Sequence, residues 1–163
     1  MSSNAQKATL VPDQHSDGGA VAVLAVLAGD EAYGFPLSSV REILVSPPVA
    51  EVPRTAEHIL GVISVRGQII TVLDLPKLLN LSVEEQRSRG RVLLVDDGQE
   101  LIGVAVDAVI QVYRLEPAQI EYASAMGAEL SDYVLGIGRM SSSASTGNHD
   151  MLILIDPVSL LGG

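Results

Sequence analysis

The side chains with the chemistry for catalysis or metal binding are few in this sequence and poorly spaced. Its three histidines, His15, His58 and His149, fall in segments typical of loops or tails, and none has a second ligand at the spacing of a metal site. We interpret each as a solvated imidazole and predict no metal site. The chain has no cysteine, so thiol catalysis and disulfides are excluded.

Three aspartates remain as candidates for acid–base chemistry. Asp74 and Asp156 each precede a segment with the pattern of a helical turn, DLPKLL and DPVSLL, where a carboxylate serves as the N-cap. Asp107 interrupts the apolar strand pattern VAVDAVIQV, and it either bridges to an arginine or faces solvent. A hydrolase or ligand-binding barrel would need these carboxylates to converge on one pocket, and this stays the alternative function.

The usual motifs for nucleotide binding and nucleophilic catalysis do not occur. The sequence has no GxxxxGK[ST] loop and no helix-opening GxGxxG. The serines of SSSAS lack the surroundings of a nucleophile elbow. We therefore predict no cofactor and no enzymatic activity.

The composition is that of a folded, strand-rich protein that does not bind nucleic acid. Aromatic residues make up only 3% of the 163 residues, so the core must consist of Val, Leu and Ile, which favour strands. The net charge is −10 and the basic residues are scattered, whereas nucleic acids require a focused positive face. The apolar run 20–29 is far shorter than the ~20 residues of a membrane span. We expect a cytoplasmic protein without direct membrane insertion.

Strand signals begin after a polar segment. Residues 1–18 have no periodicity and are interpreted as a flexible tail. The run 20–29 predicts a strand, GDEAYG a hairpin turn, and YGFPL the next strand. The segment SSVREIL is typical either of a helical turn or of a bulged strand, and it ends at Pro47 and Pro48. Residues 53–60 are expected to form a loop with one helical turn.

The stretch LGVISVRGQIITVLDL, residues 60–75, places one arginine inside an apolar segment. It predicts two strands around a tight turn at residues 66–68, followed by a short helix with Asp74 as N-cap. The guanidinium of Arg66 either pairs with Glu42 or Glu57 to organise the local structure, or reaches an acidic side chain of a partner. Both readings stay open at the level of sequence.

An internal repeat divides the chain. Segment 33–44 matches 101–115 at an offset of 69, LGVI matches LGIG at 75, and DLPKLL matches DPVSLL at 82. We expect an all-β protein of two similar units, each a meander that ends in a short helix. The predicted divisions are a first subdomain at 19–82, a second at 91–155 and a closing segment at 156–163.

In order along the chain, GDEAYGFPLSSVREIL, ILGVISVRGQIITVLDL, LIGVAVDAVIQV and MLILIDPVSLL resemble the CheW family, the adaptors of bacterial chemosensory arrays. The resemblance covers about residues 20–161. It implies two intertwined five-stranded barrels of the SH3-like type. It also implies two partners, the cytoplasmic domain of a methyl-accepting chemoreceptor and a histidine kinase of the CheA type. The chain differs from the family in Ser64, where Asn is frequent, in a longer loop at 141–149, and in the tail.

The resemblance further implies a groove that binds the helical hairpin of the receptor. Aliphatic walls and a few orienting charges suit a helix-in-groove contact, and glycines allow close approach of backbones, although each glycine also suits a turn or a bulge. On the matching positions, the groove residues are Val40, Glu42, Ile43, Gly61, Arg66, Gly103, Val109 and Gly136. The implied function is a non-enzymatic adaptor between receptor and kinase. A scaffold that associates only with itself is a third possibility.

Overall fold

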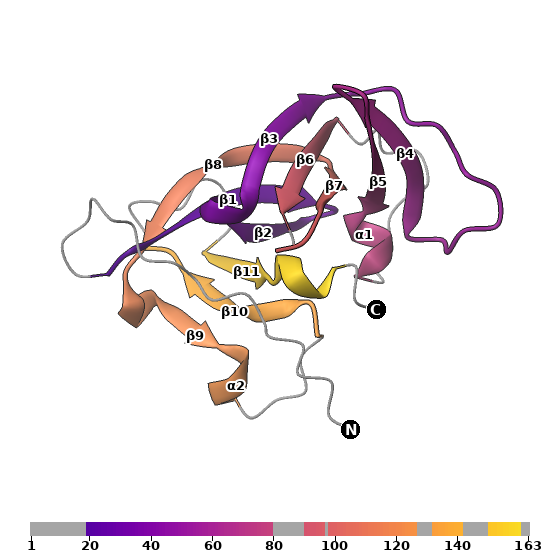
Figure 1. Ribbon diagram of the computed structural model, residues 1–163. Coiled ribbons are helices and arrows are strands. Elements are labelled where there is room, and N and C mark those ends of the chain that lie inside the picture. The colour runs from indigo at the N-terminus through magenta and orange to yellow at the C-terminus, as the bar shows by residue number, and fades with distance from the viewer. Residues whose placement is uncertain (1–18, 80–89, 97, 127–131, 142–149, 161–163) are drawn as a thin grey trace.

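Two β-sheets make up most of the protein in the computed structural model, which describes residues 19–79, 90–96, 98–126, 132–141 and 150–160 (Figure 1). The predicted tail at 1–18, most of the segment between the two predicted subdomains and most of the loop at 141–149 lie outside these residues. In spatial order, sheet A consists of β8 (Ala108–Leu115), β1 (Val21–Ala28), β2 (Glu31–Pro36), β11 (Met151–Ile155), β10 (Val134–Arg139) and β9 (Ile120–Tyr122). Sheet B consists of β3 (Val40–Val45), β6 (Arg91–Asp96), β7 (Leu101–Val106), β5 (Gln68–Asp74) and β4 (Ile59–Val65).

Each half of the sequence contributes strands to both sheets. The first half supplies β1 and β2 to sheet A but β3, β4 and β5 to sheet B. The second half supplies β6 and β7 to sheet B and its remaining strands to sheet A. The simple meander expected for each unit is therefore wrong. The reason is that β5 of the first half pairs in parallel with β7 of the second half, and β2 of the first half pairs in parallel with β11 of the second. Each sheet therefore combines strands from both halves.

The internal repeat is visible in the backbone. Asp74 and Asp156 have the same φ of −90° and ψ of 106°, and each accepts a hydrogen bond from the backbone N–H of a short helical turn. Gly34 and Gly103, which match at the offset of 69, both lie in the parallel strand pairs. Equivalent positions along the sequence thus occupy equivalent places in the two sheets.

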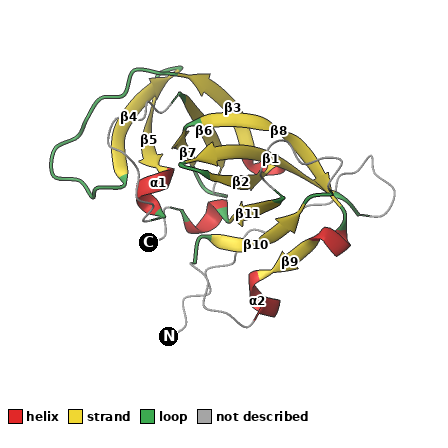
Figure 2. Ribbon diagram, turned by 180° about the vertical axis from the view of Figure 1, so that it is seen from behind, coloured by secondary structure: helices red, strands yellow, loops and turns green. Residues whose placement is uncertain are grey.

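The helical elements are short and close each half. The predicted helix after β5 is confirmed as α1 (Leu75–Leu78), with Asp74 as its N-cap. The equivalent turn, η3 (Pro157–Ser159), follows β11 and lies beside α1 in both views (Figures 1 and 2). A further 3₁₀ turn, η2 (Pro117–Gln119), and the helix α2 (Ala123–Met126) flank β9. The loop at 51–58 contains turns but no helix, contrary to the expectation.

The segment before Pro47 combines both predicted alternatives. Leu37–Ser39 form the 3₁₀ turn η1, and β3 follows with a bulge between Val40 and Glu42. The extra residue of a bulge bends its strand. Ile43, opposite Leu93, is exposed on β3, which is the edge strand of sheet B.

Aliphatic side chains fill three clusters, as the low aromatic content predicts. The central cluster joins the two sheets, because it contains Leu24 and Phe35 of sheet A together with Leu93 and Val104 of sheet B. A second cluster lies within sheet A and a third within sheet B. The described strands thus form two barrel-like units that share a continuous apolar junction.

Candidate partner-docking site

Two of the aspartates considered for acid–base chemistry, Asp74 and Asp156, accept hydrogen bonds from the backbone of helical turns. Asp156 is fully buried and accepts hydrogen bonds from Val158 N–H at 3.1 Å and from the Ser159 hydroxyl at 2.8 Å. Asp74 accepts from Lys77 N–H at 3.3 Å. These are N-cap geometries, in which the carboxylate satisfies the free amides of a helical turn.

Asp107 also has a structural role. The prediction that it interrupts a strand is wrong, because Asp107 lies between β7 and β8. Its Oδ2 accepts a hydrogen bond of 2.7 Å from Gly29 N–H in the β1–β2 turn, 78 residues away. Among the described residues, no three acidic or histidine side chains gather as a metal site would require.

The turn between β4 and β5 holds Arg66 at its tip. Val65 pairs with Gln68, so the turn contains only Arg66 and Gly67 and is one residue shorter than predicted. Their φ angles are 48° and 79°. Two consecutive positive φ values are the signature of the type I′ hairpin turn, whose twist matches that of the strands.

The guanidinium of Arg66 forms an ion pair that joins the β4–β5 turn to the edge strand β3. Its Nη2 donates to Glu42 Oε2 of β3 at 2.7 Å. This hydrogen bond holds the pKa of the Glu42 carboxyl below its usual range. Of the two acidic partners considered from sequence, the structure selects Glu42. The Arg66 side chain nevertheless remains 73% exposed.

A surface pocket opens beside this ion pair. We name it the hairpin pocket; its volume is about 560 Å³. Aliphatic and proline side chains provide most of its wall, with the ion pair as its charged part. It is lined by Glu42, Leu44, Pro47, Pro48, Ala50, Val62, Ile63, Ser64, Val65, Arg66 and Ile69. The pocket offers a partner apolar contact next to two opposite charges.

The three aliphatic residues expected to form groove walls occupy two edge strands. Val40 and Ile43 are on β3, the edge of sheet B, whereas Val109 is on β8, the edge of sheet A. Val40 and Val109 are half-buried and pack against the central cluster. Ile43 is 41% exposed. The structure thus places Val40 and Val109 beside the shared junction, whereas Ile43 is exposed on β3.

The glycines expected in the groove are buried within the sheets. A Cβ on Gly61 would lie 2.2 Å from the carbonyl oxygen of Ala50, and one on Gly136 would lie 2.3 Å from that of Glu121. Both glycines follow a bulge. Gly103 lies against Val72. In all three cases the close approach is to a segment of this chain.

Several exposed aliphatic side chains near these positions were missed in the sequence. Ile69 of the hairpin pocket is 67% exposed, Val45 of β3 is 68% exposed, and Val112 of β8 is 45% exposed. Ile69 and Val112 belong to apolar runs that predict strands, whereas Val45 directly follows SSVREIL, the segment predicted as a helical turn or a bulged strand. For Val45 the only signal was its position two residues after Ile43, since residues two apart share one face of a strand.

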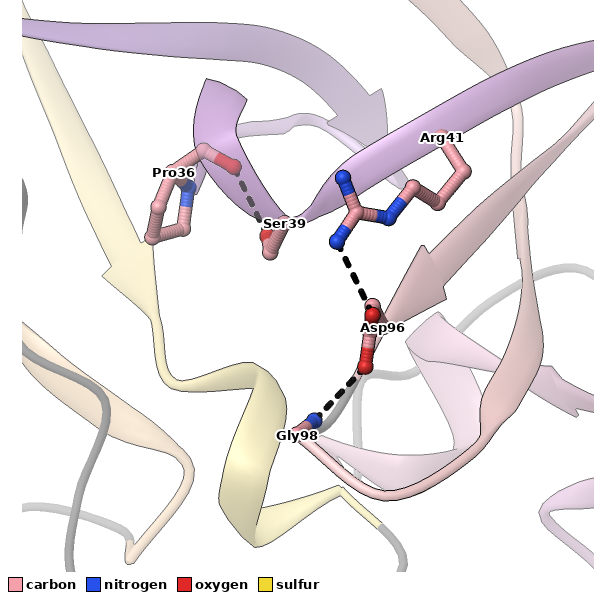
Figure 3. Close-up of polar contacts among 5 residues, drawn as sticks. All are labelled: Pro36, Ser39, Arg41, Asp96 and Gly98. Carbon is pink, nitrogen blue, oxygen red and sulfur yellow. Dashed lines mark hydrogen bonds and ion pairs between the residues drawn. The ribbon is translucent and has the colours of Figure 1, made fainter.

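Polar contacts hold the edge strand β3 at its start (Figure 3). Arg41 Nη2 donates to Asp96 Oδ2 at 2.9 Å, while Asp96 Oδ1 accepts from Gly98 N–H at 2.8 Å. The Ser39 hydroxyl donates to the carbonyl of Pro36 at 2.7 Å. The two bonds of Asp96 connect β3 to the end of β6 and to the β6–β7 turn, and the bond of Ser39 lies within the turn before β3.

No helix in the described ranges combines the length and the apolar character that crossing a membrane requires.

Comparison with known proteins relates this arrangement to one family. Residues 22–163 match the family model described as a CheW-like domain. The chain is 30% identical to a chemotaxis protein CheW of Klebsiella aerogenes over 82% of its own length and 76% of the relative's. It is 29% identical to the protein FrzA of Myxococcus xanthus, with 82% and 80% covered.

A solved structure supports the fold. The scaffolding protein TtCheW from Thermoanaerobacter tengcongensis superimposes with a TM-score of 0.72 at 26% identity. The match covers 84% of this chain and 89% of that chain. The expected pair of SH3-like barrels is confirmed. The expected strand number of five holds for sheet B but not for sheet A, which has a sixth strand because the short β9 pairs with β10.

Proposed function

Because the chain belongs to the CheW-like domain family, we propose that it is a non-enzymatic adaptor that couples chemoreceptor tips to a histidine kinase of the CheA type. Its relatives include chemotaxis proteins and a scaffolding protein. In this proposal the protein acts in the cytoplasm and reaches the membrane only through receptor arrays. It needs no cofactor.

The observation that carries the proposal is the combination of exposed aliphatic side chains and one ion pair along β3 and the β4–β5 hairpin. Ile43 offers apolar surface, and Glu42 with Arg66 offers opposite charges beside the hairpin pocket. A receptor tip is a helical hairpin, and amphipathic helices dock through aliphatic anchors with a few charges to fix their orientation. We assign the receptor to this surface, together with Val40 and Val109 at the junction.

The function of such an adaptor is positional. The central cluster packs side chains of both sheets into one apolar junction. A partner bound at the edge of one sheet is therefore held in a fixed relation to a partner bound elsewhere on the chain. A small displacement of the receptor then shifts the equilibrium of the kinase, provided that its two states differ in their contacts.

A calorimetric titration with the isolated cytoplasmic hairpin of a receptor tests the proposal. We expect Ile43→Asp to weaken binding at least about tenfold, because a carboxylate replaces an apolar anchor. Met151→Asp is the matched control, since Met151 is 55% exposed but lies on β11 outside the proposed site. Both variants should keep the circular dichroism of the wild type. Equal loss of binding in both variants contradicts the assignment of the site.

The same titration with the regulatory domain of the kinase tests the second partner. Binding of both partners to one molecule of the protein supports coupling. Binding of neither partner refutes the adaptor function.

A further inference from the structure

The chain crosses between its two sheets at two places along the described strands (Figure 1). The first crossover runs from β2 to β3 through the 3₁₀ turn η1. The second runs from β7 of sheet B to β8 of sheet A and consists of a single residue, Asp107. A connection of one residue gives the backbone little freedom. Whatever holds Asp107 therefore also holds the end of β7 next to the start of β8.

Asp107 is bound to sheet A through its backbone and its side chain. Its N–H donates to the carbonyl oxygen of Leu27 at 2.9 Å, and its Oδ2 accepts from Gly29 N–H at 2.7 Å. Gly29 is the first residue of the two-residue β1–β2 turn, and its φ of 64° suits a type II′ hairpin. The N–H of that position lies outside the ladder of its own hairpin, so the carboxylate supplies the acceptor that this amide needs.

The backbone of Asp107 also lies against sheet B. A Cβ on Gly90, the residue before β6, would lie 3.2 Å from the carbonyl oxygen of Asp107. The carbonyl of Gly90 in turn accepts a hydrogen bond of 3.2 Å from Ser46 N–H, directly after β3. Asp107 thus lies where the β1–β2 turn of sheet A meets the ends of β3 and β6 of sheet B.

The apolar junction by itself does not fix the orientation of the two sheets. The central cluster is mostly aliphatic, and hydrophobic contacts have no preferred direction, so packed elements can slide past one another. Hydrogen bonds require a narrow range of distance and angle. The proposed receptor site takes Val40 from sheet B and Val109, two residues after Asp107, from sheet A. The shape of that site therefore depends on the orientation of one sheet relative to the other.

We propose that Asp107 is a positioning residue, whose carboxylate holds the two sheets in one relative orientation and so sets the spacing of Val40 and Val109 at the receptor site. With this bond in place, a displacement of the receptor at either edge strand moves both sheets together. This inference deepens the proposed function and rests on it.

Distances between pairs of spin labels test the orientation without any partner. The chain has no cysteine, so labels can be attached at introduced ones. Met151→Cys with Val45→Cys spans the two sheets, and Val45→Cys with Ile69→Cys lies within sheet B. All three side chains are exposed, at 55%, 68% and 67%. In double electron–electron resonance, we expect Asp107→Ala to broaden the distance distribution of the first pair and to leave that of the second unchanged.

Three further variants separate the bond to Gly29 from other effects. Asp107→Asn keeps an oxygen acceptor without the charge and should retain the distribution of the wild type. Asp107→Glu displaces the carboxylate by one methylene and should broaden the distribution, which serves the test if Asp107→Ala does not fold. Asp96→Ala is the matched control. Asp96 also accepts from a glycine N–H, that of Gly98 at 2.8 Å, but its bonds lie within sheet B, so the distribution across the sheets should stay unchanged.

Calorimetric titration with the receptor hairpin measures the effect on binding. We expect Asp107→Ala to weaken binding at least about fivefold, because only a fraction of the molecules then has the orientation that binds. Asp107→Asn and Asp96→Ala should remain within about twofold of the wild type. A loss in Asp107→Ala that Asp107→Asn restores supports the positioning role.

Several results would overturn the inference. An unchanged distribution across the sheets in Asp107→Ala shows that its carboxylate does not hold them. Broadening of both label pairs indicates general loosening of the fold, and equal broadening in Asp107→Asn assigns the effect to the charge instead of the bond to Gly29. A broadened distribution with full affinity excludes a role in positioning the receptor site. Failure of the wild type to bind the hairpin refutes the proposed function itself, whereas the distances still decide whether Asp107 holds the sheets.

Discussion

Gly61→Ala tests whether the hairpin pocket depends on a close approach of two backbone segments. Gly61 has a φ of 152°, in a region that L side chains rarely adopt, and a new Cβ would lie 2.2 Å from the carbonyl oxygen of Ala50. The segment around Ala50 is bound to β4 by two hydrogen bonds of 2.9 Å between Ala50 and Val62. The substitution must therefore displace this segment, which lines the pocket.

The cost follows from these contacts. The disfavoured backbone conformation contributes roughly 1–3 kcal/mol and each lost hydrogen bond about 1 kcal/mol. We expect the free energy of unfolding to fall by about 3–5 kcal/mol in total. Gly67→Ala is the control, since Gly67 has a φ of 79° but open space around it. That variant should lose only about 1–2 kcal/mol.

Urea denaturation followed by circular dichroism measures both changes at 25 °C. The reasoning predicts that Gly61→Ala unfolds at a clearly lower urea concentration than Gly67→Ala. If the two free energies of unfolding differ by less than about 1 kcal/mol, the contact with Ala50 is adjustable and the argument from close approach fails.

Two further predictions concern buried and exposed carboxylates. Asp156→Ala should lower the free energy of unfolding by about 2 kcal/mol, because it removes the N-cap and leaves the Ser159 hydroxyl without this acceptor; an unchanged melting temperature would argue against the cap. The hydrogen bond from Arg41 lowers the pKa of Asp96 in the folded state. Its contribution is therefore present above the ordinary value near 3.8 and disappears as the pH falls through the lower folded value. Asp96→Asn should lose this acid dependence of the urea midpoint, at a cost below about 1 kcal/mol at pH 7 since the pair is partly exposed; an acid profile identical to that of the wild type would contradict it.

Features that depend on neighbours in sequence were predictable. The apolar strand pattern, the hairpin tip at Arg66 and Gly67, and the N-cap of Asp74 follow from local conformational preferences and short-range hydrogen bonds. The repeat and the resemblance to the CheW family identified the fold, because matched positions along the chain occupy matched places in the two sheets.

Only the tertiary structure decided which strands share a sheet and which apolar residues remain exposed. Parallel pairing of β5 with β7 and of β11 with β2 exchanges strands between the two halves, and such long-range pairs leave no trace in local pattern. The tertiary structure also decided that Glu42, 24 residues from Arg66, is the partner of this arginine. Ile69 belongs to an apolar strand pattern, yet it is 67% exposed. The burial of a side chain and the pairing of a strand both depend on segments that are distant in sequence and pack against that strand.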